Sequence, residues 1–343
     1  MRVIRNTMYV TTMGAYLSLD GENVVVSKDG DEIGRRPLHT LQGIIIFGYS
    51  NASSALMGKC AEKGIEISFL NMYGGFIGRF VGKINGNVLL RKEQYRISDN
   101  EERSLEIAKS FIIGKIYNSR WVIERFMRDY AMRIDVEKFK KASKFLYNSL
   151  SMVKECDSKD RLRGIEGEAA SVYFNVFNDM ILQQKEDFVF RTRNKRPPLD
   201  AVNALLSFSY TLLAHEISSA ISAVGLDPYV GFMHTDRPGR QSLALDLMEE
   251  FRSVLADRFA LSLINKKVIT GKDFYVKENG AILLKDEARK ELLSQWQKRK
   301  MEVLTHPFTK EKLQWGMVPF IQAQLLARYI RGDMDAYPPF MWK

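Results

Sequence analysis

The chain has 343 residues, enough for one large domain or two ordinary ones, and its composition of 45% hydrophobic and 27% charged residues excludes a disordered or fibrous protein. Lysine and arginine number 51 against 41 acidic residues, and a net charge of +10 favours a polyanionic partner such as nucleic acid, although many basic proteins bind none. No apolar run approaches the about 20 residues that a bilayer requires, and the first 13 residues do not read as a signal peptide, so we expect a cytoplasmic protein with no membrane partner.

The first 96 residues are predicted to form a β-rich domain. Asp-Gly and Asn-Gly steps separate short β-branched runs, and these residues tolerate the positive φ of hairpin turns. One helix is expected at 53–63, where a serine caps the start and Gly64 follows the end. The expected strands are 8–12, 15–20, 24–27, 43–47, 65–70, 76–84 and 88–90.

From Asn100 the apolar residues recur with the period of helices. We expect one hairpin among these helices, at 272–284, and a tail (337–343) that either packs across a neighbour or forms a coil. The expected helices are 101–117, 119–133, 136–154, 164–185, 199–224, 241–262, 285–302 and 313–331. The sequence therefore predicts an α+β fold, with an N-terminal β-rich domain at 1–96 and a larger all-α domain at 101–343.

Two motifs of the helical half could support chemistry. Glycines and small residues surround Glu166 in the run 164–170 and leave room for an ion or a phosphate beside it; a solvated glutamate favoured by the helix dipole is the alternative. The apolar run 229–233 ends at His234, at the mouth of a charged loop. A buried core histidine is the alternative there.

Two further motifs carry charge. Asp246 lies three residues before Glu249 and four before Glu250, so the three acids share one helix face; an exposed acidic face, partly compensated by Arg252, is the alternative. The Pro-stiffened loop 191–198 suits a phosphate backbone, or is only a solvated loop. Its cations are Arg191, Arg193, Lys195 and Arg196.

Taken together, these motifs supply carboxylate oxygens and one imidazole, a ligand set that suits Mg²⁺ or Mn²⁺ better than a thiolate-rich zinc site. In a basic protein this set matches metal-assisted phosphodiester chemistry, in which an ion activates the attacking hydroxyl and offsets charge on the leaving oxygen. The chain has no P-loop, no dinucleotide fingerprint, no Gly-x-Ser-x-Gly elbow and no Cys-x-x-Cys pair.

In these motifs the chain resembles the CRISPR-associated spacer integrase, the larger of the two universal adaptation proteins, and looks closest to the branch that accompanies type I-C systems. The family's glutamate in Gly-x-Glu-Gly falls on Glu166, and its histidine closing Gly-Phe-x-His falls on His234. On the helix Leu-Asp-Leu-x-Glu-Glu, the metal-ligand position is Glu249 and the companion acid is Asp246. Some members carry aspartate where this chain has Glu249. The resemblance extends over essentially the whole chain.

The resemblance implies a metal-dependent, hydrolase-type DNA endonuclease and integrase that inserts prespacer DNA into a CRISPR array by attack of a 3′-hydroxyl. It implies that Glu166, His234 and Glu249 bind Mg²⁺ or Mn²⁺, with Asp246 as a fourth ligand or a base behind the ligands. Phosphate contacts are expected from the six cations Arg191, Arg193, Lys195, Arg196, Arg237 and Arg240.

The implied partners are double-stranded DNA, both prespacer and repeat, and other protein chains. A homodimer is expected, and two dimers would flank a dimer of a small companion adaptation protein to form a heterohexamer. We expect dimerisation through residues 1–96, because short β domains expose strand edges that pair across a twofold axis. Two alternatives stay open: a stand-alone structure-specific nuclease that uses water as the nucleophile, and a non-catalytic DNA-binding scaffold.

Overall fold

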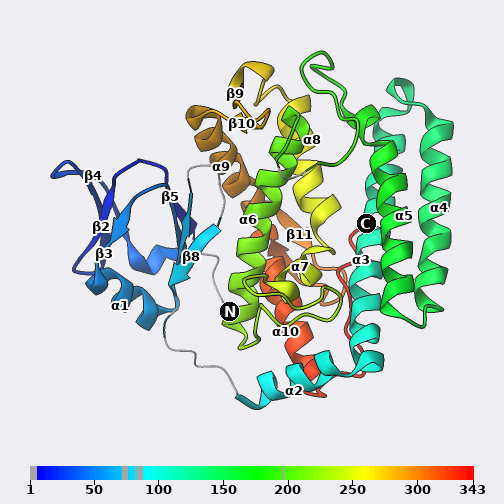
Figure 1. Cartoon of the computed structure of the whole chain (residues 1–343), viewed down its shortest axis with the longest axis horizontal. Helices are drawn as coiled ribbons and strands as arrows, with labels where there is room; N and C mark the ends of the chain where they lie inside the picture. Colours follow the sequence, from blue (N-terminus) through cyan, green and yellow to red (C-terminus); the bar gives the residue numbers. More distant parts are fainter. Residues whose placement is uncertain (1–5, 72–75, 81, 83–87, 195–196) are drawn as a thin grey trace. The chain divides into compact units, whose positions relative to one another are not determined.

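The computed structural model describes residues 6–71, 76–80, 82, 88–194 and 197–343 (Figure 1). The chain divides into two compact units. The first comprises residues 1–85 with 289–302 and 314–317, and the second comprises 86–288, 303–313 and 318–343. The predicted α+β class is confirmed, with a β-rich N-terminal region followed by helices.

The first unit contains two four-stranded sheets. One has the order β1-β5-β7-β8, in which β5 runs parallel to both neighbours and β8 is antiparallel to β7. The other has the order β4-β3-β2-β6, in which β2, β3 and β4 form an antiparallel meander. The bounds are β1 (Asn6–Val10), β2 (Tyr16–Asp20), β3 (Asn23–Lys28), β4 (Asp31–Pro37), β5 (Leu41–Phe47), β6 (Asn51–Ala52), β7 (Glu66–Leu70), β8 (Phe76–Phe80) and helix α1 (Ser54–Lys63).

The core of the first unit consists of apolar side chains that alternate along its strands, such as Leu17, Val24 and Ile44. Helix α1 begins at the predicted cap, because the Ser53 hydroxyl accepts the N–H of Leu56, and it ends at Gly64 with φ of 66°. Helix α9 (Asp286–Met301) comes from the far end of the chain, yet its residues from Arg289 onward belong to this unit. There Gln297 donates to the backbone oxygen of Thr7 at 2.8 Å.

The second unit is predominantly helical (Figure 1). Its main helices are α2 (Val88–Asp99), α3 (Glu101–Tyr130), α4 (Val136–Lys154), α5 (Lys159–Asn175), α6 (Ala201–Ala223), α7 (Ser242–Met248), α8 (Arg258–Asn265) and α10 (Val318–Ile330). A π-helical segment (Arg252–Asp257) precedes α8. The strand pairs are β9 (Phe274–Val276) with β10 (Ile282–Leu284), the predicted hairpin, and β11 (Val303–Thr305) with β12 (Lys312–Gln314).

Several predicted elements differ from the structure, and the helix expected at 313–331 begins only at Val318, because 312–314 form strand β12. The expected strand 88–90 is the first turn of α2, in which Leu90, Gln94 and Ile97 are buried at helical spacing. The helices expected at 101–117 and 119–133 form one 30-residue helix, α3, which continues through the buried Asn118. The helix expected from 164 starts at residue 159, where the Ser158 hydroxyl accepts the N–H of Arg161, so Glu166 lies inside α5.

The C-terminal tail packs along α3 of its own chain (Figure 1). The amide of Asn118 donates to the backbone oxygen of Phe340 at 2.7 Å, and its oxygen accepts the N–H of Trp342 at 2.9 Å. Buried Glu250 accepts hydrogen bonds from the Tyr337 hydroxyl and the Phe340 N–H. The tail therefore occupies the side of α3 next to the acid-bearing segment 246–250.

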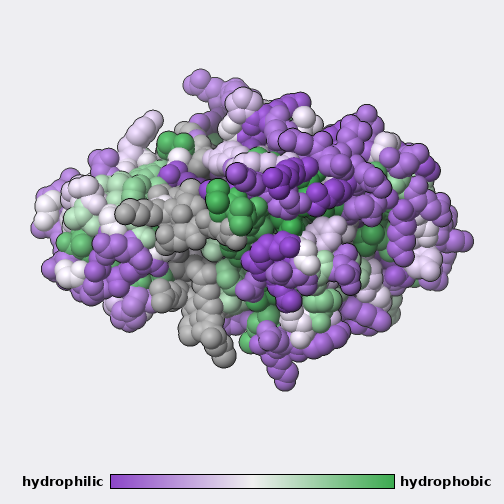
Figure 2. All heavy atoms as spheres, turned by 90° about the horizontal axis from the view of Figure 1, so that it is seen from below, coloured by the Kyte–Doolittle hydropathy of each residue, from purple (hydrophilic) through white to green (hydrophobic). Residues whose placement is uncertain are grey.

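Figure 2 shows hydrophilic side chains over much of the face seen there. Within the described ranges, no helix combines the length and the apolar character needed to cross a bilayer. Both cysteines, Cys60 and Cys156, are buried and free.

Candidate active site

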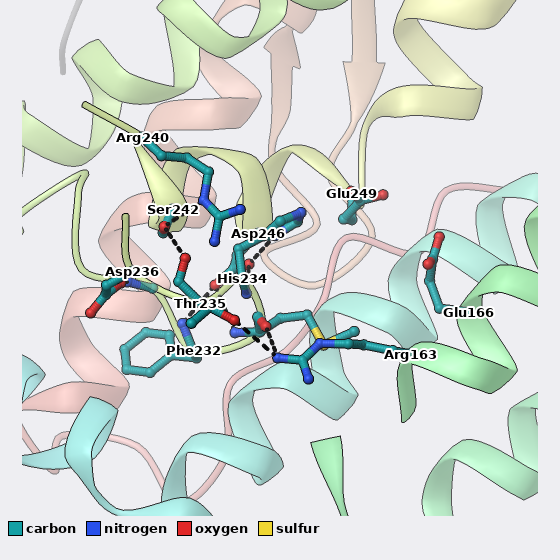
Figure 3. Close-up of polar contacts among 12 residues, drawn as sticks. Arg163, Glu166, Phe232, His234, Thr235, Asp236, Arg240, Ser242, Asp246 and Glu249 are labelled. Carbon is teal, nitrogen blue, oxygen red and sulfur yellow. Dashed lines mark hydrogen bonds and ion pairs between the residues drawn. The ribbon is translucent and has the colours of Figure 1, made fainter. Parts of the chain in front are cut away.

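Two of the predicted acids meet at one lysine. Glu166 lies on α5, Glu249 directly follows α7, and Lys115 lies on α3. The Lys115 ammonium forms an ion pair with Glu166 Oε1 and lies 2.7 Å from Glu249 Oε2. Figure 3 shows Glu166 and Glu249 entering the site from different elements and facing each other. Packing of α3 against α5 and α7 thus brings together two carboxylates that are far apart in the sequence.

A second cation holds the other side of Glu249. The Arg252 guanidinium lies 3.0 Å from Glu249 Oε1, one helical turn along the chain. Burial alone would raise the pKa of Glu249, whose side chain is 6% exposed, but the charges of Arg252 and Lys115 and the hydrogen bond from Lys115 outweigh it and lower the pKa. Burial likewise opposes the charge on Lys115, yet Glu249 and Glu166 raise the pKa of its ammonium. Glu249 and Lys115 therefore stabilise each other's charged form.

Asp246 is fully buried and is surrounded by hydrogen-bond donors. Its Oδ2 accepts the backbone N–H groups of Phe232 at 2.6 Å and Met233 at 2.9 Å. Its Oδ1 accepts the N–H of His234 at 2.9 Å and lies 2.6 Å from the ring Nδ1 of the same residue (Figure 3). A Cβ on Gly231 would lie 2.8 Å from Asp246 Oδ2, so this close approach requires glycine.

This arrangement fixes the orientation of His234. Because an ionised carboxylate only accepts hydrogen bonds, Nδ1 of the ring carries a proton and donates it to Asp246. The neutral ring then has its lone pair on Nε2, as in metal-binding histidines whose other nitrogen is held by a carboxylate. The His234 side chain is 30% exposed, so its ring can be reached from solvent.

Other segments of the second unit hold the His234 loop in place. On α2, the amide of Gln94 donates to the backbone oxygens of Asp227 and Val230, both at 2.8 Å. The Ser98 hydroxyl donates to Gly231 at 2.7 Å. From α5, the Arg163 guanidinium donates to the backbone oxygen of Met233 at 3.1 Å (Figure 3). The loop is therefore braced by both neighbouring helices.

The structure brings the predicted ligands together only in part. Across the ranges that are described, no three His, Cys, Asp or Glu side chains are grouped as an ion site. What Glu166 and Glu249 share is the Lys115 ammonium, and Asp246 directs its oxygens at the His234 loop. The binding of one ion by Glu166, His234 and Glu249 stays a prediction.

The predicted phosphate contacts differ in their exposure. Arg191 and Arg237 are exposed, and Arg240 is half-buried beside the Ser242 hydroxyl. Lys195 and Arg196 lie outside the described residues.

The Arg193 side chain makes its hydrogen bonds inside the protein. Its guanidinium donates to Asn203 at 2.6 Å and to Ser207 at 3.1 Å, and burial lowers its pKa. It also stacks on the ring of Tyr210 at 5.2 Å, and Arg252 stacks on the same ring at 4.8 Å. Arg193 is thus less available to a phosphate than the sequence suggests, and it is linked through Tyr210 to the cation that holds Glu249.

Lys115 is the site residue that the sequence reasoning missed. A signal for it exists, because Phe111 and Ile112 belong to the buried stripe of α3 and Lys115 follows them by four and three residues. A lysine on the apolar face of a helix needs an acidic partner. Which acids it meets depends on the packing of α3 against α5 and α7.

Comparisons with a family profile and with known proteins all identify the same family. The family profile described as CRISPR associated protein Cas1 matches residues 8–298. The chain is 49% identical over 338 residues to CRISPR-associated endonuclease Cas1 1 of Chlorobaculum tepidum, covering 98% of both chains. It is 50% identical over 347 residues to CRISPR-associated endonuclease Cas1 2 of Rhodospirillum rubrum, covering 100% of both. Among solved structures, a casposase bound to integration product has a similar fold, with a TM-score of 0.84, 24% identity, and coverage of 99% of this chain and 95% of that one.

Proposed function

This chain belongs to the family of CRISPR-associated protein Cas1 and is a nuclease of CRISPR adaptation, and we propose that it joins the 3′-hydroxyl ends of prespacer DNA to a CRISPR array with the help of a divalent metal ion. One observation carries this proposal. Two carboxylates, one on α5 and one at the end of α7, converge on a single cation, beside an imidazole that is oriented by a buried aspartate.

The side chains fit Mg²⁺ or Mn²⁺. The position between Glu166 and Glu249 already holds a positive charge, and the buried Oε2 of Glu249 lies 2.7 Å from that ammonium. Glu166, Glu249 and Nε2 of His234 would hold the ion. When bound there, such an ion would supply activation of the attacking hydroxyl and stabilisation of charge on the leaving oxygen.

The protein's own groups position the site. Asp246 fixes the ring of His234, and its four donors support the predicted place behind the ligands over the alternative of a fourth ligand. Arg252 keeps Glu249 ionised and holds one of its oxygens. The nucleophile is the DNA 3′-oxygen, which forms the new bond to phosphorus while the 3′-oxygen of the array strand leaves.

DNA is held through its phosphates. Arg191 and Arg237 are exposed cations, and Arg240 lies beside the start of α7. Lys195 and Arg196 follow Arg191 by four and five residues in the sequence. Together with the net charge of +10, these residues support contact with duplex DNA, both prespacer and repeat.

The working assembly is proposed to be a heterohexamer in the cytoplasm, in which two homodimers of this chain flank a dimer of the small companion adaptation protein. Dimerisation through residues 1–96 is supported by the four sheet edges β1, β8, β4 and β6 of the first unit. Light scattering of the full-length chain tests this, and a monomer at micromolar concentration contradicts it.

The test of the activity is a plasmid integration assay. The protein is mixed with a supercoiled CRISPR plasmid and a labelled 3′-hydroxyl duplex, with and without the companion protein. We expect Mg²⁺- or Mn²⁺-dependent transfer of label to the plasmid, abolished by EDTA. Nicking without transfer, in the presence of the companion, indicates instead a stand-alone nuclease that uses water. Binding without either reaction indicates a non-catalytic scaffold.

A further inference from the structure

Lys115 lies at the point that the proposed metal ion would occupy. Its ammonium contacts one oxygen of Glu166 and lies 2.7 Å from one oxygen of Glu249, and its side chain is 16% exposed. No other cation among the described residues is paired with both carboxylates, since Arg252 is paired with Glu249 alone. Lys115 is therefore the group that keeps the two acids together in this structure.

The two carboxylates need a cation between them. Glu249 is 6% exposed and Glu166 is 26% exposed, so water screens their repulsion only weakly. A divalent ion on the same oxygens would leave no room for the ammonium and would repel it. An ammonium and the ion consequently exclude each other at this site.

The two neighbouring cations differ in their freedom to leave. Arg252 is a planar group bound to Oε1 of Glu249 one turn away on its own segment, and it stacks on Tyr210 at 4.8 Å. Lys115 sits at the end of a flexible four-carbon chain and binds as a point charge. Lys115 can therefore swing away while Arg252 stays in place.

We propose that Lys115 competes with the metal ion for its site, an inference that rests on the proposed metal-dependent function. The ammonium of Lys115 bridges Glu166 and Glu249 when no ion is bound, and it is displaced when an ion binds. In such an equilibrium the apparent metal affinity equals the intrinsic affinity multiplied by the fraction of molecules in which the lysine has left. Removing the ammonium should thus tighten metal binding while it destabilises the metal-free protein.

The test compares Mn²⁺ binding to full-length wild type, Lys115→Met and Lys115→Gln. Isothermal titration calorimetry and Mn²⁺ electron paramagnetic resonance give the affinity without reference to activity, and thermal unfolding with and without Mn²⁺ gives the stability. Lys115→Gln keeps a hydrogen-bond donor beside the acids and serves if the methionine variant does not fold. Lys109→Met is the matched control, because Lys109 is also on α3 and pairs at 2.8 Å with Glu106 outside the site.

We expect both Lys115 variants to melt at a lower temperature than wild type without metal, to bind Mn²⁺ at least about tenfold more tightly, and to gain a larger melting shift from it. Lys109→Met should bind Mn²⁺ as wild type does. Unchanged or weaker binding by both Lys115 variants overturns the inference while leaving the metal site intact. If wild type, Lys115→Met and Lys115→Gln all fail to bind Mn²⁺, the proposed metal-dependent function fails instead.

Discussion

Replacing Asp246 with asparagine isolates the effect of one buried charge on His234. The two side chains have nearly the same shape, but asparagine presents one oxygen and one NH₂ group to the four donors that now point at the carboxylate. If the NH₂ group replaces Oδ2, it faces the N–H groups of Phe232 and Met233, and neither can stop donating. If it replaces Oδ1, it faces the N–H and the Nδ1 of His234.

The second orientation is the favourable one, because the imidazole can move its proton from Nδ1 to Nε2 and accept a hydrogen bond from the asparagine. One backbone N–H, that of His234, is then left unsatisfied, which costs about 1–3 kcal/mol of folding free energy. The hydrogen bonds that remain also lose their negative acceptor, so we expect a value near the upper end of this range. The larger effect is on function, since a protonated Nε2 cannot bind a metal ion. By analogy with other residues that orient metal ligands, Mn²⁺ affinity should fall about 10- to 100-fold.

Three measurements check this reasoning: urea unfolding, calorimetric Mn²⁺ titration, and ¹⁵N NMR of labelled histidine, which distinguishes the two tautomers. Asp236→Asn is the matched control, because Asp236 lies on the same loop but is exposed and accepts only a 3.3 Å contact from Gly231 N–H. The argument is refuted if the Asp246→Asn protein keeps the Nδ1-protonated tautomer and wild-type Mn²⁺ affinity. An equal loss in Asp236→Asn would also refute it.

Three further outcomes follow from the structure. Burial raises the pKa of Glu250 from 4.5 to about 8. The stability that this group contributes is therefore fully present below pH 4.5 and is lost as the pH rises through 8. The urea midpoint of unfolding should fall over this pH window in wild type and should fall less in Glu250→Gln. Glu249→Gln should bind duplex DNA normally in fluorescence anisotropy but lose strand transfer, whereas impaired DNA binding would argue for a purely structural acid. Arg191→Ala with Arg237→Ala should lower the slope of log affinity against log salt by up to about 1.8, whereas Arg193→Gln should leave the slope unchanged, because its guanidinium is used internally.

Local patterns predicted much of the fold. Helix α1 could be placed from its serine cap and its C-terminal Gly64, and the hairpin of β9 and β10 from its Asn-Gly turn, because both signals act over a few residues. The recruitment of α9 into the first unit could not be predicted, since its contacts join residues such as Gln297 and Thr7 across nearly the whole sequence. The strand predicted at 88–90 was wrong because a short apolar run does not distinguish a strand from the first turn of a helix.

For the candidate site, the motifs identified His234, Asp246, Glu166 and Glu249, but they did not predict which groups each of these side chains contacts. Spacing along a helix placed Asp246 and Glu249 on one face, yet the structure turns Asp246 toward the His234 loop and Glu249 toward Lys115. That difference depends on the backbone of the loop preceding α7, which sequence periodicity does not describe.

The most direct test of the central claim is anomalous diffraction from crystals of the full-length protein soaked in Mn²⁺. The account predicts one manganese peak within about 2.0–2.6 Å of carboxylate oxygens of Glu166 and Glu249 and of Nε2 of His234, with the Lys115 ammonium displaced from both acids. A peak at other residues, or a soaked crystal in which Lys115 still bridges the two carboxylates and no manganese lies beside His234, would contradict it.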